Sequence, residues 1–289
     1  MPYATVATFI VSLLGASAPW VLTLDRTNWC LGETPLNLLV LGIVYRGVAW
    51  PIFWTVLEKK GNSNTAERIA LLGMFLHQFG AESIAYLTAD REFIGKKWFS
   101  WLRSNKIAFR IRIKANTKVQ NRRAREVAGW RLFSALRLNE AVAFSRPYKM
   151  WGMEIYLSGM RLKGGEYLIV ASDEQALEAL AEYAKRWEIE TLFGCMKSRG
   201  FRLEETHVTD RERLKKLFAL LAIAFCWAHI VGEWLVEKKG LKIKIKKHGR
   251  KARSIFRVGY DHLRRITCRP ESRLQLLEFR RLVLLLSCT

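Results

Sequence analysis

The sequence predicts an α/β fold in which helices flank a mixed β-sheet, with a β-rich insertion and a helical C-terminal region. Half of the 289 residues are hydrophobic and 12% are aromatic, which is enough to build a sizeable core. Along residues 20–114, apolar runs typical of strands alternate with runs at helical spacing. Such alternation is typical of a sheet covered by helices.

The first half of the chain supplies the elements of this sheet in order. A short apolar run over 20–24 ends at Asp25 and indicates a buried strand. Two β-rich runs, 36–45 and 48–57, meet at Arg46-Gly47 and indicate a hairpin. The expected elements that follow are a helix from Thr65, a strand over 83–89 that ends before Asp90, a helix over 95–104 and a strand over 107–114.

The second half of the chain has a different composition and hydrophobic pattern. From about 115 to 165, basic residues, short β-like runs and glycines replace the helical periodicity, which indicates a β-rich insertion. A strand over 167–171 follows, and Ser172 or Asp173 is expected to cap a long helix that continues to Lys197. The rest is expected to be helical except for the basic block 238–253.

These elements divide the chain into five expected segments. They are a remnant N-terminal segment (1–19), the first part of the core (20–114), the β-rich insertion (115–166), the second part of the core (167–236) and a basic C-terminal region (237–289).

The charge of the chain points to a polyanionic partner. Its 48 Lys and Arg outnumber 26 Asp and Glu, which gives a net charge of +22. A folded chain this basic usually faces a polyanion, and a merely soluble basic protein is the alternative. Phosphate contacts in the block 238–253 would be salt-sensitive and independent of DNA sequence, whereas the alternative role of that block is solubility.

Cysteines and apolar runs bear on the compartment. The five cysteines stand singly, which indicates a reducing environment and no disulfide or zinc framework. An apolar run over 4–15 resembles a signal peptide, but no Lys or Arg precedes it. The run 217–236 is long enough to span a bilayer, but it contains His229 and Glu233. We therefore expect a buried helix there and a cytoplasmic protein with no membrane partner.

Asp25 and Asp90 each lie at or just beyond the end of an expected strand. Sites in open α/β sheets are usually built at the carboxyl ends of strands, and two carboxylates there can hold a hard divalent ion. Each aspartate by itself is also an ordinary turn or cap residue. Asp173 follows a strand too and competes for the role of second acid, but its place at the start of a helix favours capping.

The strongest signal is a stripe on the expected long helix, formed by Tyr183, Arg186, Glu190 and Lys197. Their offsets of 0, 3, 7 and 14 residues place them within an arc of roughly 60° on a helix. An acid flanked by cations suits a metal ligand beside a bound phosphate. The alternative is a solvated face with an ordinary Arg186–Glu190 pair.

This stripe resembles the Tyr-Arg-Glu-Lys signature of one branch of the bacterial insertion-sequence transposases, which are DDE transposases. Two further segments, Leu24–Trp29 and Ala89–Phe93, resemble those that carry the first two acids of the family. The resemblance covers about residues 20–235. It implies that the mixed sheet is an RNase H-like catalytic core.

The resemblance also implies roles for individual residues. Asp25, Asp90 and Glu190 would be the catalytic acids and would bind two Mg²⁺ ions, which Mn²⁺ can replace. One ion would activate the attacking water or 3′-hydroxyl, and the other would stabilise the departing 3′-oxygen. The implied DNA-binding residues are Tyr183, Arg186 and Lys197 at phosphates, and Trp151, Tyr167 and Trp130 as candidates for stacking on a flipped base, although such aromatics are often core residues.

The implied function is a transposase that cuts DNA at the ends of an insertion sequence and joins them to a target by cut and paste. Its partners would be the terminal inverted repeats, the target duplex and a second copy of the chain, at the nucleoid in a bacterial cytoplasm. Only 24 residues, apolar rather than basic in character, precede Asp25, where family members carry a DNA-recognition domain, which indicates a truncated copy. The alternatives are a non-catalytic DNA-binding copy that inhibits an intact transposase, and a nuclease of the same fold that cuts without joining.

Overall fold

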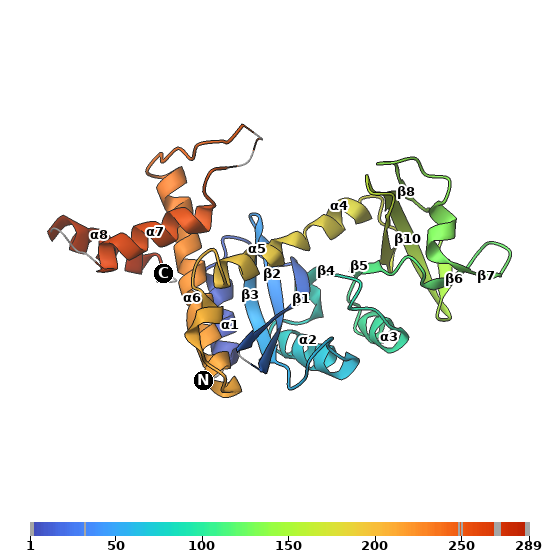
Figure 1. Cartoon of the computed structure of the whole chain (residues 1–289), viewed down its shortest axis with the longest axis horizontal. Helices are drawn as coiled ribbons and strands as arrows, with labels where there is room; N and C mark the ends of the chain where they lie inside the picture. The colour runs from blue at the N-terminus through green and yellow to red at the C-terminus, as the bar shows by residue number, and fades with distance from the viewer. Residues whose placement is uncertain (1–2, 32, 248, 250, 269–272, 287–289) are drawn as a thin grey trace. The chain divides into compact units, whose positions relative to one another are not determined.

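The computed structural model describes residues 3–31, 33–247, 249, 251–268 and 273–286, which form a large mixed sheet with flanking helices (Figure 1). The chain divides into two compact units. Unit 1 comprises Met1–Gly15, Trp29–Leu36 and Thr191–Thr289, and unit 2 comprises Ala16–Asn28 and Asn37–Glu190. The expected α/β fold class is confirmed, including its helical C-terminal region.

The elements follow the predicted order closely through residue 113. They are α1 (Tyr3–Ser12), β1 (Trp20–Leu31), β2 (Thr34–Tyr45), β3 (Val48–Val56), α2 (Thr65–Phe79), the 3₁₀ turn η1 (Ala81–Ser83), β4 (Ile84–Ala89), α3 (Lys96–Ser104) and β5 (Phe109–Ile113).

The remaining elements are shorter strands followed by helices. They are β6 (Lys118–Gln120), β7 (Glu126–Ala128), η2 (Gly129–Phe133), β8 (Ala141–Ala143), β9 (Tyr148–Met150), β10 (Met153–Arg161), β11 (Tyr167–Ser172), α4 (Ala179–Ala184), α5 (Trp187–Met196), η3 (Leu203–Thr206), α6 (Arg211–Glu237), α7 (Ile255–Cys268) and α8 (Arg273–Leu284).

The N-terminal strands pair in the order β3-β2-β1-β4-β5. β2 and β3 form an antiparallel hairpin, and β1, β4 and β5 run parallel. The hairpin turns at Arg46 (φ 49°) and Gly47 (φ 86°), because a two-residue turn with positive φ matches the twist of the strands. The predicted hairpin is therefore confirmed.

An aromatic cluster attaches α2 to the sheet. The ring of Phe75 lies 6.5 Å from Trp20 of β1 and 6.5 Å from Phe53 of β3, both in edge-on geometry. Asn64 starts the helix with a capping box, because its side chain accepts from the backbone N–H of Glu67 while the Glu67 side chain accepts from that of Asn64. The helix thus begins at Thr65 as predicted and packs on the face of the sheet formed by β1 and β3.

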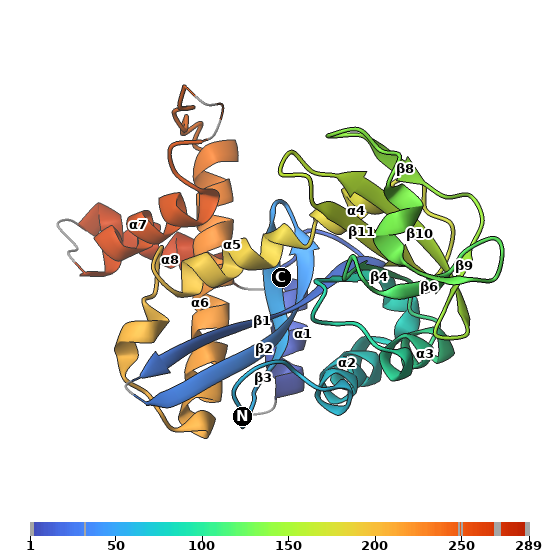
Figure 2. The same cartoon turned by 45° about the vertical axis from the view of Figure 1, so that its right-hand side comes forward.

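The β-rich insertion extends the sheet beyond β5 (Figure 2). β11 pairs antiparallel with β5, and β10 pairs antiparallel with β11. The short strands β8 and β9 pair with β10, and β6 and β7 continue beyond β9. The chain thus returns from the insertion along β11, directly beside the core strands.

The prediction of one long helix from Ser172 or Asp173 to Lys197 is wrong. α4 begins only at Ala179, and a turn at Lys185 and Arg186 separates it from α5. Asp173 caps no helix, because its Oδ1 accepts a hydrogen bond from the backbone N–H of Phe109 at 2.9 Å and ties β11 to β5. Helical periodicity did not reveal this break.

β1 is also longer than predicted, since it continues past Asp25 to Leu31. The expected strand stopped at the first charged side chain. Beyond it, Thr27 and Trp29 are buried while Asn28 and Cys30 are exposed, which is the alternation of a strand with one covered face.

α6 and α7 pack closely within unit 1. The crossing lies at Gly232 and Gly259, where any side chain would collide with the carbonyl of Ile255 or of Ala228. Within the described residues, α6 is the one helix long and apolar enough to cross a membrane, and half of its most apolar stretch is buried inside the protein. The four described cysteines are free thiols, and Cys288 lies outside the described residues.

Candidate active site

Asp25 and Asp90 lie side by side at one edge of the sheet. The parallel pairing of β1 and β4 ends at Leu24 and Ala89, so the two aspartates are the next residue on each strand. Burial raises the pKa of Asp25 to about 6, although a hydrogen bond from the backbone N–H of Arg26 opposes this. Strand register alone therefore brings the two predicted acids together.

Arg186 bridges Asp25 and Glu190 through two hydrogen bonds. Its Nη1 donates to Asp25 Oδ2 at 3.0 Å, and its Nη2 donates to Glu190 Oε1 at 2.9 Å. The Arg186 side chain is only 5% exposed, whereas that of Glu190 is 43% exposed. The turn between α4 and α5 carries Arg186, so the helix break turns its guanidinium inward between two carboxylates.

Tyr183 contacts the second acid. Its hydroxyl donates to Asp90 Oδ1 at 3.2 Å. Burial raises the pKa of Tyr183 to about 12, so the hydroxyl keeps its proton and remains a donor at neutral pH. Arg112 of β5 approaches the same oxygen at 3.9 Å. All three predicted acids thus lie in unit 2, each beside a residue of the predicted stripe.

A second set of contacts ties the two strand ends together behind the acids. Arg26, the neighbour of Asp25, donates from Nε and Nη2 to the carboxylate of Glu92 at 3.0 Å. Glu92 lies two residues after Asp90 and also accepts from the backbone N–H of Ser63 at 3.2 Å. Both side chains are mostly buried, at 14% and 16% exposure. The Arg26–Glu92 pair therefore fixes the segments that carry Asp25 and Asp90.

The loop before α2 completes this network. Arg68 is buried and donates to the carbonyl oxygens of Ser63 and of Glu92. Asn37 of β2 accepts from Arg26 at 3.3 Å and donates to the carbonyl of Gly61 at 2.8 Å. Four chain segments thus hold one another through buried polar contacts.

Three residues that sequence reasoning did not place at this site lie around it. Arg112 faces Asp90, and its place in the alternating basic strand β5 was the available signal. Trp187 follows Arg186, is 58% exposed and lies with its ring centre 4.6 Å from the Arg186 guanidinium. Glu92 was visible only as part of the segment that resembles the family's second acid.

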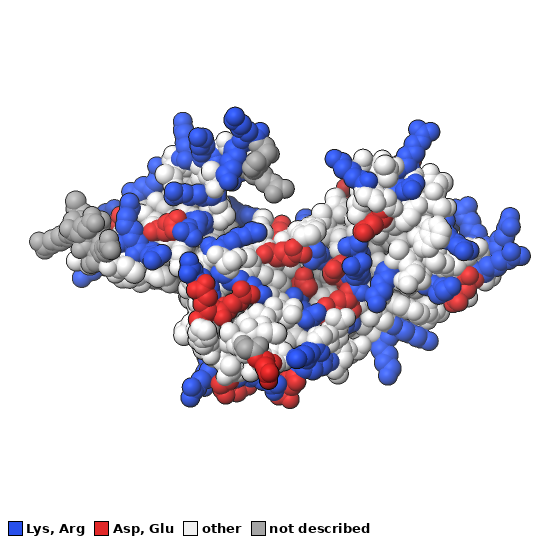
Figure 3. Space-filling view, in the orientation of Figure 1, with Lys and Arg blue, Asp and Glu red and all other residues white. Residues whose placement is uncertain are grey.

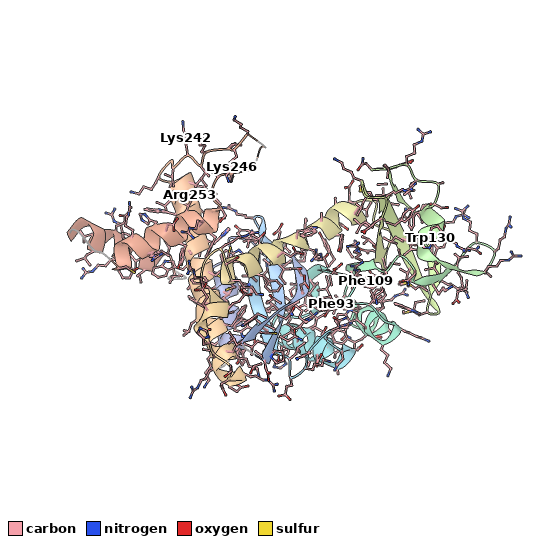
Figure 4. The ribbon with its side chains drawn as sticks, in the orientation of Figure 1. Phe93, Phe109, Trp130, Lys242, Lys246 and Arg253 are labelled. Carbon is pink, nitrogen blue, oxygen red and sulfur yellow. The ribbon has the colours of Figure 1, made fainter. Side chains whose placement is uncertain are left out.

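The three aromatic residues predicted to stack on a flipped base lie in two different environments in the structure. Tyr167 stacks on Trp130 with ring centres 6.2 Å apart and planes at 26°. The two rings line a pocket of about 280 Å³ that also includes Arg91 and Arg112. Trp151 instead packs edge-on against a ring of α3. Figure 4 shows Trp130 on the short helix of the insertion.

Lys197 belongs to unit 1, whereas Asp25, Asp90 and Glu190 belong to unit 2. Its Nζ pairs with Glu204 at 2.8 Å and lies over the ring of Trp29 at 5.3 Å. The basic block 238–253 lies between α6 and α7, with Lys242, Lys246 and Arg253 on it (Figure 4). Blue side chains gather over this loop in Figure 3, and positions 248 and 250 lie outside the described residues.

The donor set fits a divalent ion in chemistry, because carboxylate oxygens are the ligands that Mg²⁺ prefers. Asp25 and Glu190 already share one positive charge, which the guanidinium of Arg186 supplies. In the part of the chain that the structure describes, no three His, Cys, Asp or Glu side chains lie close enough together to hold a metal ion. An ion placed between Asp25 and Glu190 would compete with Arg186 for the same carboxylate oxygens.

One protein-family model matches the chain. The family model described as "Transposase DDE domain" matches residues 41–227, which is more than half of the chain. The chain therefore belongs to the transposase DDE domain family. Asp25 precedes the matched span, so its place in the site rests on the strand register.

Among solved structures, the chain is similar to a piggyBac transposase in a synaptic complex with hairpin DNA, determined by cryo-electron microscopy. The identity is 13% and the TM-score is 0.45, over 91% of this chain and 57% of that one. The chain thus spans less than two thirds of the length of that transposase. No curated protein matches the sequence.

Proposed function

We propose that this chain is the catalytic part of a DNA transposase of a bacterial insertion sequence, which cuts DNA at element ends and joins them to a target by cut and paste. One observation carries the proposal. Three acids on separate elements, Asp25, Asp90 and Glu190, gather around the Tyr183–Arg186 turn at the edge of an RNase H-like sheet. The family supports the reaction class, and the geometry supports these residues as its acids.

The three acids would hold the divalent ions of the site, two Mg²⁺ in the full reaction, with Mn²⁺ as a substitute. When bound, such ions supply activation of a water or 3′-hydroxyl and charge stabilisation at the departing oxygen. Tyr183 keeps Asp90 oriented through its protonated hydroxyl. Arg186, released from the acids, is free to donate to a DNA phosphate, which a planar guanidinium binds well.

DNA binds along the basic surfaces of both units in this proposal. Lys197 contacts a phosphate, and the block 238–253 adds salt-sensitive contacts. Tyr167 and Trp130 offer a stacked aromatic surface beside Arg91 for an extrahelical base, and this favours Tyr167 over Trp151. Its partners are the terminal inverted repeats, the target duplex and a second copy, in a bacterial cytoplasm at the nucleoid.

The segments of the chain take separate roles. Residues 20–114 and 167–236 form the catalytic core, 115–166 form the insertion that meets the extrahelical base, and 237–289 form a basic region on the duplex, while 1–19 precede the core.

A second candidate is a non-catalytic DNA-binding protein that inhibits an intact transposase. The observation in its favour is that Arg186 pairs with both Asp25 and Glu190, so that one guanidinium occupies the space between two of the candidate acids. A same-fold nuclease that cuts without joining is a third candidate.

The deciding experiment is a cleavage and joining assay. Purified protein is mixed with a labelled duplex that carries the terminal repeats flanking the gene and with a target plasmid, in Mg²⁺, in Mn²⁺ or in EDTA. We expect metal-dependent nicking at the repeat end followed by joined product. Asp25→Asn, Asp90→Asn and Glu190→Gln should each reduce cleavage to background, with Glu126→Gln on the insertion as the matched control.

The outcomes separate the candidates. Cleavage without joined product supports the nuclease. Salt-sensitive binding with no cleavage in either metal supports the inhibitor. An acid variant that cleaves at the wild-type rate removes that residue from the site.

A further inference from the structure

A polar pocket lies on α7 beside the loop that follows α5, entirely within unit 1. It has a volume of about 460 Å³. Arg257, Tyr260 and Arg264 line it from α7, at offsets of three and seven residues that place them on one face of the helix. Ser198 and Arg202 line it from the loop, together with Gly200 and Phe201.

Close packing fixes this loop on α7. Phe201 lies edge-on to Phe256 at 5.7 Å and to Tyr260 at 5.4 Å. Any side chain at Gly200 would collide with the ring of Phe256. The backbone N–H of Arg202 donates to the carbonyl of Lys197 at 2.9 Å. The pocket is therefore built from two segments whose contacts leave little freedom.

The charges that line the pocket are all positive. Three guanidinium groups face it, and no carboxylate is among its lining residues. Arg257 is paired with Asp261 at 2.9 Å, and Arg202 with Glu205 at 3.2 Å on an exposed surface. Across the described residues, Arg264 has no carboxylate within ion-pair distance. The three guanidinium groups have only two carboxylate partners between them, so an anion that bridges the three positive charges is favoured.

Guanidinium and hydroxyl donors in one pocket match the oxygens of a phosphate group, because guanidinium groups donate two parallel hydrogen bonds and hydroxyls add single ones. A phosphate inside the pocket would lie within reach of both segments. Carboxylate ligands fit less well, since they offer fewer oxygens to three cations.

We propose that this arginine pocket binds phosphates of a DNA backbone. The source is a duplex, since the pocket begins at the residue after Lys197. The backbone of Arg202, which lines the pocket, is hydrogen-bonded to the carbonyl of Lys197, so a duplex bound at Lys197 would run beside the pocket. The inference rests on the proposed DNA-binding function.

The test measures binding in EDTA, so that it does not depend on catalysis. The full-length chain and Arg264→Gln are titrated against a fluorescein-labelled random-sequence duplex at several salt concentrations, followed by anisotropy. We expect weaker binding of the variant and a slope of log K against log salt that is smaller in magnitude by about one, as for one lost phosphate contact. Arg264→Lys should keep the wild-type slope, and Arg281→Gln, an exposed arginine of α8, is the charge-matched control.

Each outcome decides. Equal slopes for Arg264→Gln and wild type overturn the proposal, as does an equal loss in Arg281→Gln. A deoxynucleoside monophosphate is titrated in parallel, and a loss of its binding with unchanged duplex binding would assign the pocket to free nucleotides and overturn the DNA assignment. If the slopes change as expected but no metal-dependent cleavage occurs, the pocket stands and the transposase function fails.

Discussion

Arg186 lies between Asp25 and Glu190, at 3.0 Å from one carboxylate and 2.9 Å from the other. A single buried guanidinium thus bridges two of the three candidate acids and supplies one positive charge between them. A divalent ion bound to the same oxygens would compete with this guanidinium.

We therefore expect Arg186→Gln to lower stability without metal and to increase the stabilisation that metal provides. Removing one partner of a mostly buried ion pair costs about 3 kcal/mol, here at the low end because Glu190 is partly exposed. Thermal unfolding with and without Mg²⁺ measures both effects. A Mg²⁺-induced shift in Tm no larger in the variant than in wild type would contradict competition between Arg186 and the ion. Lys185→Gln, at the neighbouring exposed position, serves as control.

The Arg26–Glu92 pair is expected to position Asp25 and Asp90 rather than to touch DNA. Glu92→Gln keeps the size of the side chain but removes the charge that holds Arg26, so the two strand ends lose their link. We expect the cleavage rate to fall by about 10- to 100-fold, as for small displacements of catalytic groups. The affinity for duplex DNA in EDTA should not change. An equal loss of DNA affinity would contradict a positioning role, whereas Glu92→Asp should recover part of the rate.

Arg110 of β5 holds β11 and α4 to the core. It is 4% exposed and pairs with Asp173, Glu174 and Glu182. Arg110→Met leaves these carboxylates without their cation, so we expect the free energy of unfolding to fall by about 3–5 kcal/mol. Urea unfolding measures the change. Arg137→Met, on an exposed arginine, should alter it by less than about 0.5 kcal/mol. Similar values for the two variants would refute the role of Arg110.

Glu188 makes stability depend on pH. Burial raises its pKa from 4.5 to about 7, with Lys185 and the backbone N–H of Gly47 acting in the opposite direction. The folded state therefore holds a proton that the unfolded state releases, and its contribution is present below pH 4.5 and lost as the pH rises through about 7. Wild type should lose stability from pH 5 to pH 8 relative to Glu188→Gln, which carries no charge at either pH. Parallel urea curves at the two pH values decide this, since other titrating groups cancel in the difference. A constant difference between the proteins would contradict the raised pKa.

Local patterns along the chain were enough to predict much of the fold. Apolar runs and alternation predicted the strands through β5, and the Arg46-Gly47 turn predicted the hairpin. The polar run before Thr65 predicted the start of α2. These features depend on neighbouring residues, so they can be predicted from the sequence without knowledge of the fold. The break between α4 and α5 could not be predicted, because no proline or glycine marks it and the residues on both sides have helical character.

The candidate site was predictable in its residue types and not in its contacts. Asp25, Asp90 and Glu190 could be selected from strand ends and from a spaced signature. Their assignment as acids stays a prediction. The proximity of Asp25 and Asp90 follows from the register of β1 on β4. No spacing rule joins Arg26 to Glu92, which are 66 residues apart.

The sequence by itself determined the class of fold and the strong positive charge, and it selected the candidate acids, because periodicity, motif spacing and composition can be read without the fold. Only the tertiary structure decided that Arg186 faces inward between two acids, that Tyr167 pairs with Trp130 and that three arginines share a pocket on α7. These depend on how distant segments approach one another. That approach is set by packing and strand register, which no local pattern encodes.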